Sequence, residues 1–238
     1  MAYLTGTLHI SKLENAVKNA VDAMLKEKES LVKLVLEWSD RDVAGPQDAV
    51  THGRVLEDLQ PHSNLKELRI CHFRGMQELQ EVEELQDKCP QGNNVSLEKL
   101  KIRNCPKLAK LPSFPKLRKL KIKKWRFPGD SSSNPVSDVD CCPKLHALPQ
   151  VFAPQKLEIN RCELLRDLPN PECFRHLQHL AVDQECQGGK LVGAIPDNSS
   201  LCSLVISNIS NVNSFPKCLI CPVSSLAYSA LQRSNVFV

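Results

Sequence analysis

The sequence contains no hydrophobic run long enough to cross a membrane. Its 238 residues are 42% hydrophobic and 24% charged, as in a folded soluble protein, but no stretch approaches the roughly 18 apolar residues of a membrane span. The first ten residues also lack the basic and apolar regions of a secretory signal. We therefore expect no membrane span and a cytoplasmic location.

Signatures of nucleotide binding and of common hydrolases are missing as well. The one Gly-Lys pair, Gly189 and Lys190, is followed by Leu191 and lacks the upstream glycine that a P-loop requires. No Gly-x-Ser-x-Gly elbow occurs, and the seven histidines show no spacing that pairs them with a nucleophile. We predict that the chain is not an enzyme, has no catalytic residues and binds no cofactor.

Two groups of cysteine and histidine residues only partly match the spacing of metal ligands. Cys218 and Cys221 form a lone C-x-x-C pair, without the second pair that completes a zinc site. The other group does not have the spacing of a zinc finger: Cys162, Cys173, His176 and His179. We predict no metal site.

A hydrophobic phrase that recurs along the chain is the strongest pattern present. It runs from Leu97 to Pro112 and returns from Leu157 to Pro169 and from Leu204 to Pro216. Its spacing, L-x-x-L-x-L-x-x-N/C-x-L, is typical of leucine-rich repeats. Weaker copies keep the same phase, with their strands at Leu8, Leu34, Leu68, Leu120, about 137 and Leu180. The pattern predicts an α/β solenoid, a curved horseshoe with a parallel concave β-sheet and an irregular or helical convex side.

The repeats define the expected organisation of the chain. We predict one leucine-rich-repeat domain over residues 1–216, irregular over 1–95 and regular over 96–216, followed by a non-repeat tail over 217–238. Leucine spacing predicts helices over 12–29, 50–59 and 77–88, and residues 129–135 read as a loop. The apolar repeat pattern is weak at the strand expected near Val139. An uncapped solenoid exposes its last apolar layer, so we expect a piece of a longer array.

Eleven cysteines would suggest disulfide bonds in a secreted protein. Cys105 and Cys162, however, occupy an apolar position of the repeat, where a thiol serves as a small buried hydrophobe. We therefore expect a reducing, intracellular setting. Three glycosylation sequons, at Asn94, Asn198 and Asn208, point the other way, but no export signal accompanies them.

Positive charge is concentrated in one part of the chain. Between Ser96 and Arg126 there are twelve Lys or Arg residues and a single acid, Glu98, although the whole chain carries only +4. Because strand side chains alternate, Lys and Arg should project from the sheet where Leu100 and Ile102 point into the core. Specificity is expected from these projecting residues: Glu67, Arg69, Lys99, Lys101, Arg103, Lys119, Lys121, Lys123, Glu158 and Asp183.

Six cations on two adjacent strands repel one another unless an anionic surface meets them. This favours a protein partner with an acidic patch, either another domain of the same polypeptide or a separate protein. A solvated basic face without a partner explains the charge equally well. Nucleic acid is not favoured, since only Trp125 and Phe127 accompany the charge and no nucleic-acid-binding motif is present.

Several blocks of the sequence resemble one known family. Thr7–Asn15, Leu25–Trp38, Val55–His62 and Asn64–Leu68, in that order, are similar to the repeat region of plant disease-resistance proteins. Asn104–Pro112 is similar to their C-terminal repeats. The proteins in question are intracellular immune receptors with a coiled coil, a nucleotide-binding domain and leucine-rich repeats.

The resemblance implies a protein-recognition module for a pathogen effector, a guarded host protein or the receptor's own nucleotide-binding domain. The coiled coil and the P-loop of the family are not in this sequence, so no residue here inherits a role in ADP or ATP binding. Two alternatives stay open: a leucine-rich-repeat adaptor for a ubiquitin ligase, and a truncated decoy that does not signal.

Overall fold

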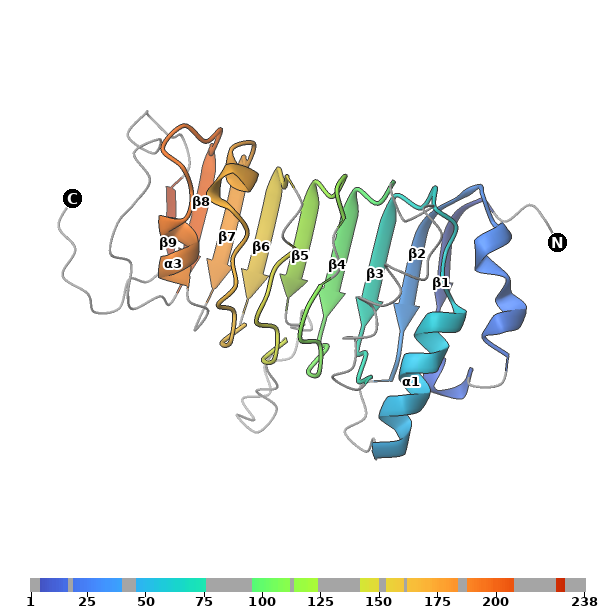
Figure 1. The fold of residues 1–238 in the computed structure, drawn as a ribbon. Coiled ribbons are helices and arrows are strands. Elements are labelled where there is room, and N and C mark those ends of the chain that lie inside the picture. Colours follow the sequence, from blue (N-terminus) through green and yellow to red (C-terminus); the bar gives the residue numbers. More distant parts are fainter. Residues whose placement is uncertain are drawn as a thin grey trace.

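A computed structural model describes residues 5–16, 19–39, 46–75, 96–111, 114–123, 142–149, 153–160, 162–183, 188–207 and 226–229. Nine parallel strands form one open sheet in chain order (Figure 1). They are β1 Gly6–Ile10, β2 Leu31–Glu37, β3 Glu67–Cys71, β4 Lys99–Arg103, β5 Lys119–Lys123, β6 Lys156–Asn160, β7 His179–Asp183, β8 Ser203–Ser207 and β9 Leu226–Ser229. This arrangement confirms the expected leucine-rich-repeat solenoid.

Equivalent apolar residues of successive strands are direct neighbours in the sheet. Leu100 pairs with Leu68 on one side and Leu120 on the other, and Ile102 pairs with Ile70 and Ile122. Because side chains alternate along a strand, both rows point to the same side and form a continuous core. Leu100 and Ile102 are 2% and 3% exposed, so the repeat register read from the sequence is the register of the sheet.

The turns that lead into the strands are stacked in the same way. The backbone N–H groups of Glu98 and Lys99 both donate to the carbonyl of Lys66, and those of Arg118 and Lys119 donate to the carbonyl of Glu98. After the strands, the buried Cys105 and Cys162 thiols donate to the carbonyl oxygen two residues earlier. Both side chains are almost fully buried, which confirms their expected role as small buried groups.

The prediction of one helix over residues 12–29 is wrong. Three short 3-10 helices occur there instead: η1 Leu13–Asn15, η2 Val21–Ala23 and η3 Leu25–Glu27. Lys12 and Met24 adopt left-handed backbone conformations, which interrupt an α-helix. The apolar stripe is also not used as one face, because Leu13 and Leu25 are buried whereas Val21 is 61% exposed.

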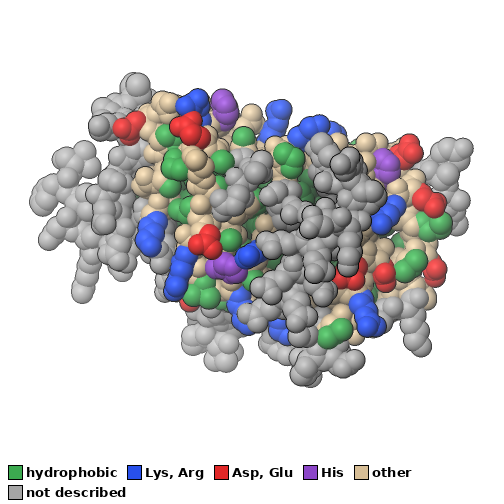
Figure 2. All heavy atoms as spheres, viewed as in Figure 1, with side chains coloured by type: hydrophobic (Ala, Val, Ile, Leu, Met, Phe, Trp, Pro, Cys, Tyr) green, Lys and Arg blue, Asp and Glu red, His purple; other side chains and the backbone are tan. Residues whose placement is uncertain are grey.

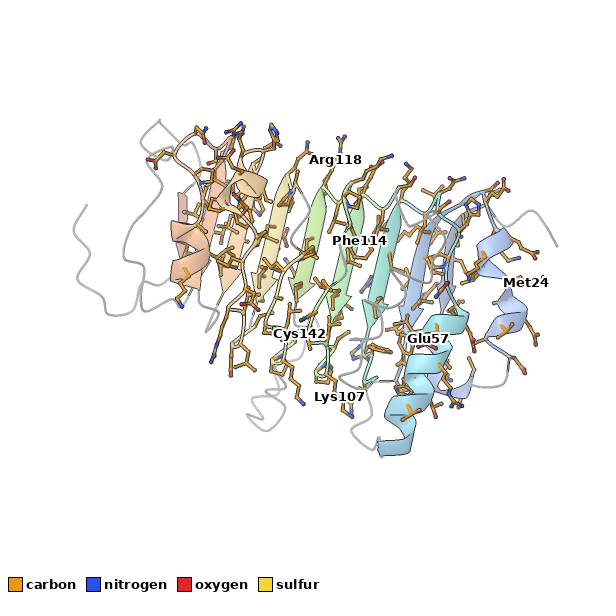
Figure 3. The ribbon with its side chains drawn as sticks, in the orientation of Figure 1. Met24, Glu57, Lys107, Phe114, Arg118 and Cys142 are labelled. Atoms are coloured by element: carbon orange, nitrogen blue, oxygen red, sulfur yellow. The ribbon has the colours of Figure 1, made fainter. Side chains whose placement is uncertain are left out.

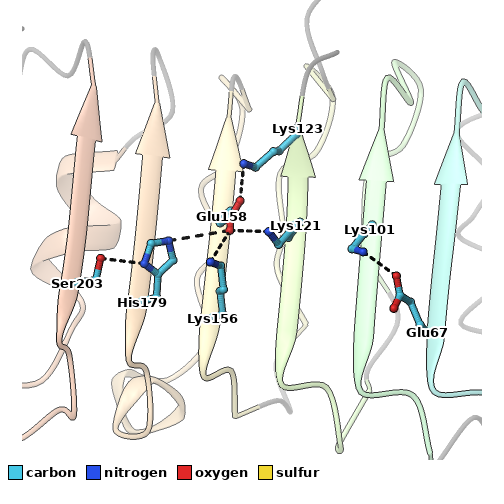
Figure 4. Close-up of polar contacts among 8 residues, drawn as sticks. All are labelled: Glu67, Lys101, Lys121, Lys123, Lys156, Glu158, His179 and Ser203. Atoms are coloured by element: carbon cyan, nitrogen blue, oxygen red, sulfur yellow. Dashed lines mark hydrogen bonds and ion pairs between the residues drawn. The ribbon is translucent and has the colours of Figure 1, made fainter. Parts of the chain in front are cut away.

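The longest helix among the described residues, α1 Pro46–Asp58, confirms the helix expected over 50–59 and begins earlier. A proline is well tolerated in the first turn, where its missing N–H would have no partner. The helix α3 Gly188–Gly193 lies on the same side of the sheet as α1 (Figure 1). Figure 4 shows the sheet from its other side, and there α3 lies behind the strands. A further 3-10 helix, η5 Pro171–Phe174, is capped by the Asn170 side chain.

Two expectations about the strands need correction. β5 pairs directly with β6, so no strand lies between them, and the expected strand near Val139 falls outside the described residues. Residues 142–149 join the array through their core side chains and a bridge between Ala147 and Asp167. The backbone N–H of His146 also donates to the carbonyl of Ala109. β9 pairs in parallel with β8, so the sheet continues beyond Pro216, where the tail was expected to leave it.

Other expectations are not tested. The helix over 77–88 and the loop over 129–135 lie outside the described residues, and the division at residue 95 stays a prediction.

In Figure 3, Lys107 and Arg118 lie at opposite ends of the strands. Phe114 and Cys142, labelled in the same view, belong to the buried core.

Replacing Leu100 by Ala should lower the free energy of unfolding by about 2 to 5 kcal/mol, because it leaves a cavity in the continuous core. Urea unfolding followed by circular dichroism measures the change. Leu164→Ala is the matched control, since Leu164 is 43% exposed and its truncation should cost no more than about 0.5 kcal/mol. Equal effects of the two changes would contradict the register.

Candidate protein-binding face

The alternate residues that point away from the core form what we call the open face. On β4 it carries Lys99, Lys101 and Arg103, which pair in register with the open-face residues of β5. Their side chains are exposed or half-buried, in alternation with fully buried ones. The β5 residues are Lys119, Lys121 and Lys123. The two strands therefore place six cations in three adjacent pairs, as the sequence predicted.

Glu158 of β6 lies among the lysines of this face and is only 3% exposed. Its carboxylate oxygens are 2.8 Å from Lys121 Nζ, 2.5 Å from Lys123 Nζ and 3.0 Å from Lys156 Nζ (Figure 4). Register explains the arrangement, because Glu158 is the direct neighbour of Lys121 on β5. One buried carboxylate thus binds three lysines from two strands.

Two opposing effects act on the pKa of Glu158. Burial raises the pKa, but hydrogen bonds from Lys121, Lys123 and Lys156 outweigh burial and lower it to about 2 from an ordinary value of 4.5. The side chain is therefore ionised at any pH at which the protein would work.

Glu67 of β3 has a similar role on the other side of β4. Its Oε1 is 2.6 Å from Lys101 Nζ and 3.5 Å from Lys33 Nζ on β2, and its side chain is 14% exposed. Burial raises the pKa of Glu67, but the hydrogen bond and charge of Lys101, with the charge of Lys33, lower it overall. Lys101 is therefore already neutralised within the sheet.

His179 of β7 borders the Glu158 cluster. Its Nδ1 is 2.9 Å from Ser203 Oγ, and its Nε2 is 4.0 Å from Glu158. Burial and the positive charge of Lys156 lower the pKa of His179, and the charge of Glu158 only partly opposes this effect. At neutral pH the imidazole is therefore a neutral neighbour of the cluster.

Lys99 and Lys119 differ from the other lysines of the face. Within the described part of the chain neither forms a close ion pair, although the two are direct neighbours in the sheet. Lys99 also lies beside Glu67 of β3, and its charge helps to lower the pKa of Glu67. Together with Glu67, Lys101 and Lys121, the two lysines line an open depression of about 210 Å³. Among the described residues, the positive charge between β4 and β5 is therefore only partly balanced.

The other predicted residues lie on the same sheet. Arg69 pairs with Lys101 in register. Asp183 lies on β7, beside Asn160 and Ser207; the placement of its side chain is outside the described set. On the opposite side of the molecule, hydrophobic and charged side chains of both signs are interspersed (Figure 2).

Sequence analysis missed the ion pairs within the face. It treated Glu67 and Glu158 only as projecting residues, and it did not include Lys33 or Lys156. The expectation that the cations need an external anionic surface is therefore corrected for Lys101 and for the lysines around Glu158. Glu158 and Lys121 occupy the same position of the repeat on adjacent strands. This shared position was a signal that could have revealed the Glu158 cluster.

Within the described ranges, no three His, Cys, Asp or Glu residues are placed to hold a metal ion. In those same ranges, no helix is both long and apolar enough to cross a bilayer.

A sequence model of the R13L1/DRL21 leucine-rich repeats matches residues 1–125, more than half of the chain. The chain belongs to this family. It is 35% identical over 116 residues to the putative disease resistance protein RGA1 of Solanum bulbocastanum, and 33% identical over 140 residues to disease resistance protein RGA2 of the same species. These matches confirm the resemblance to plant disease-resistance proteins, and identify a leucine-rich-repeat module of that type.

The matched regions cover 48% and 58% of this chain but only 11% and 13% of the two relatives. The chain therefore spans a small share of the curated proteins that it matches. No solved structure matches significantly. The arrangement of the open face thus comes from the present structure alone.

Replacing Glu158 by Gln should remove a pH-dependent part of the stability of this R13L1/DRL21-type module. Because folding lowers the pKa of Glu158, its contribution is present above about pH 4.5 and is lost as the pH falls toward 2. The free energy of unfolding of the unmodified protein should fall over this range by up to about 3 kcal/mol more than that of the variant. Urea unfolding at several pH values measures the difference.

Glu172→Gln is the control for this experiment. Glu172 also forms an ion pair, with Arg175, but its side chain is 61% exposed, so its removal should leave the pH dependence almost unchanged. A Glu158→Gln protein with the same pH dependence as the unmodified protein would contradict the buried cluster.

Proposed function

We propose that this chain is the protein-recognition module of a plant disease-resistance receptor and binds an acidic protein surface through its open face. The observation that carries the proposal is the row of lysines set in register on β4 and β5, in which Lys99 and Lys119 form no close ion pair with any described residue. A leucine-rich-repeat module from the disease-resistance group is consistent with recognition as its role.

The dimensions of the face suit a protein partner. Parallel strands lie about 4.8 Å apart, so nine of them make a surface roughly 40 Å long. Projecting side chains alternate with buried ones along each strand, so the face offers many polar contacts on a rigid support. We take it to be the concave side of the solenoid, where a partner can contact several repeats at once.

Charge complementarity indicates the character of the partner. Acidic residues opposite Lys99 and Lys119 would relieve the repulsion between them and would speed association. A pathogen effector, a guarded host protein and the receptor's own nucleotide-binding domain are the candidates that the family suggests, all encountered in the cytoplasm. Recognition of this kind needs no catalysis and no cofactor bound by this chain.

Cross-linking with a carbodiimide tests the proposal, because this reagent joins lysine amines directly to carboxylates. The full chain would be mixed with purified effectors and with the nucleotide-binding domain of a resistance protein, and cross-linked peptides would be identified by mass spectrometry. We expect intermolecular links from Lys99 and Lys119 to Asp or Glu of the partner, with fewer links at high salt.

Lysines away from the open face provide the internal control. Lys107 and Lys116 lie in the turns between strands and should form few intermolecular links. Links confined to these turn lysines, or binding that does not depend on salt, would contradict recognition by the open face.

A further inference from the structure

We propose that the depression between β4 and β5 is a subsite for one dianionic group of the partner, either a phosphorylated side chain or two adjacent carboxylates. The inference rests on the proposed function, since it assumes a protein partner on the open face. It goes further by assigning the anionic contact to two lysines and by giving the charge of the group that they bind.

The ion pairs of the face divide its lysines into two classes. Lys101 is bound to Glu67, and Lys121 is bound to Glu158, so each of these cations has an anion at 2.6 or 2.8 Å. Lys123 and Lys156 also contact Glu158. A partner that engaged these lysines would have to compete with a carboxylate already in place, which reduces the gain in free energy.

Lys99 and Lys119 belong to the second class. They are register neighbours on adjacent strands, and their positions lie about 5 Å apart. Among the described residues neither forms a close ion pair, although Lys99 lies beside Glu67, which already binds Lys101 and Lys33. Like charges placed opposite each other in a sheet are destabilising. An anion between the two ammonium groups would turn this repulsion into attraction, and a charge of about −2 would balance both.

The chemistry of the lining favours a compact oxyanion. Each ammonium group has three donors and no acceptor, so it can donate to several oxygens of one ligand. A phosphorylated side chain offers three acceptor oxygens and a charge of about −1.5 to −2 at neutral pH, and two adjacent carboxylates offer a similar charge. Glu67 is the one acidic residue of the lining, and it repels an anion from the β3 side.

Fluorescence anisotropy with three labelled peptides of otherwise identical neutral sequence tests the subsite on the full chain. One peptide carries a phosphoserine, the second two adjacent aspartates, and the third an unmodified serine. We expect the first two to bind at low ionic strength and the third not to bind. Inorganic phosphate should compete for the same site. The tighter of the two anionic peptides identifies the source of the charge.

Variants separate the subsite from a general attraction to the basic face. Lys99→Gln with Lys119→Gln should weaken binding of the anionic peptides by about tenfold, because two charged contacts are lost. Lys107→Gln with Lys116→Gln removes the same charge from the turns. Lys123→Gln with Lys156→Gln removes it from the Glu158 cluster. Either control should weaken binding by less than about threefold.

Glu67→Gln gives an effect of the opposite sign. It removes the acid that repels the ligand and releases Lys101 from its ion pair, so affinity for both anionic peptides should rise by about threefold or more. A role of these residues in folding alone would not improve binding. Circular dichroism of each variant checks that the fold is retained.

Three results would overturn the subsite: no binding of either anionic peptide, equal weakening by all three double variants, or tighter binding of an oligonucleotide through Lys99 and Lys119. The proposed function can fail separately. If a protein partner cross-links to the open face but tolerates the Lys99 and Lys119 changes, only the subsite is wrong. If the peptides bind here while protein partners cross-link elsewhere, recognition by this face is wrong and the subsite remains.

Discussion

In-register pairing of parallel strands is the constraint on which the rest of the structure depends. It places Leu100 beside Leu68 and Leu120 and so builds a core that continues from one repeat to the next. The same pairing places Lys99 beside Lys119 and Lys101 beside Lys121 on the other face. A register that is favourable for the core therefore brings together like charges, which the fold must balance or leave for a ligand.

Two glutamates balance much of this charge. Glu158 is almost fully buried, and a lone carboxylate there would be costly, but three ammonium groups surround it. The lysines keep part of their surface in water, so the cluster requires less desolvation than a fully buried ion pair. Glu67 acts likewise between β2 and β4. These clusters leave Lys99 and Lys119, in the depression between β4 and β5, as neighbouring cations of the face that form no close ion pair with a described residue.

The recurring phrase was enough to predict the fold, the register and the direction of most projecting residues. It works because each strand carries its own alternating pattern, as at Leu100 and Ile102. The ion pairs are harder to predict, since Glu158 and Lys121 are far apart in sequence and meet only through pairing. The charge of residues 96–126 suggested a wholly basic face because its counter-ions lie outside that segment.

Other errors also have physical causes. Leu13 and Leu25 have helical spacing, but left-handed residues such as Met24 divide the segment into short 3-10 turns. The sequence of β9 has only a short apolar pattern, and this strand joins the sheet by pairing Leu226 with Leu204 of β8. Where a segment depends on its neighbour in the sheet, its own sequence is a weak guide.

The division of the lysines into balanced and unbalanced classes is the central claim, and their reactivity tests it most directly. Trace acetylation of the free chain, with site-resolved rates from mass spectrometry, measures how available each amine is. Lys99 and Lys119 should react faster than Lys121, Lys123 and Lys156, and the Glu158→Gln change should remove most of that difference. Equal rates for all five lysines in the unmodified protein would contradict the division.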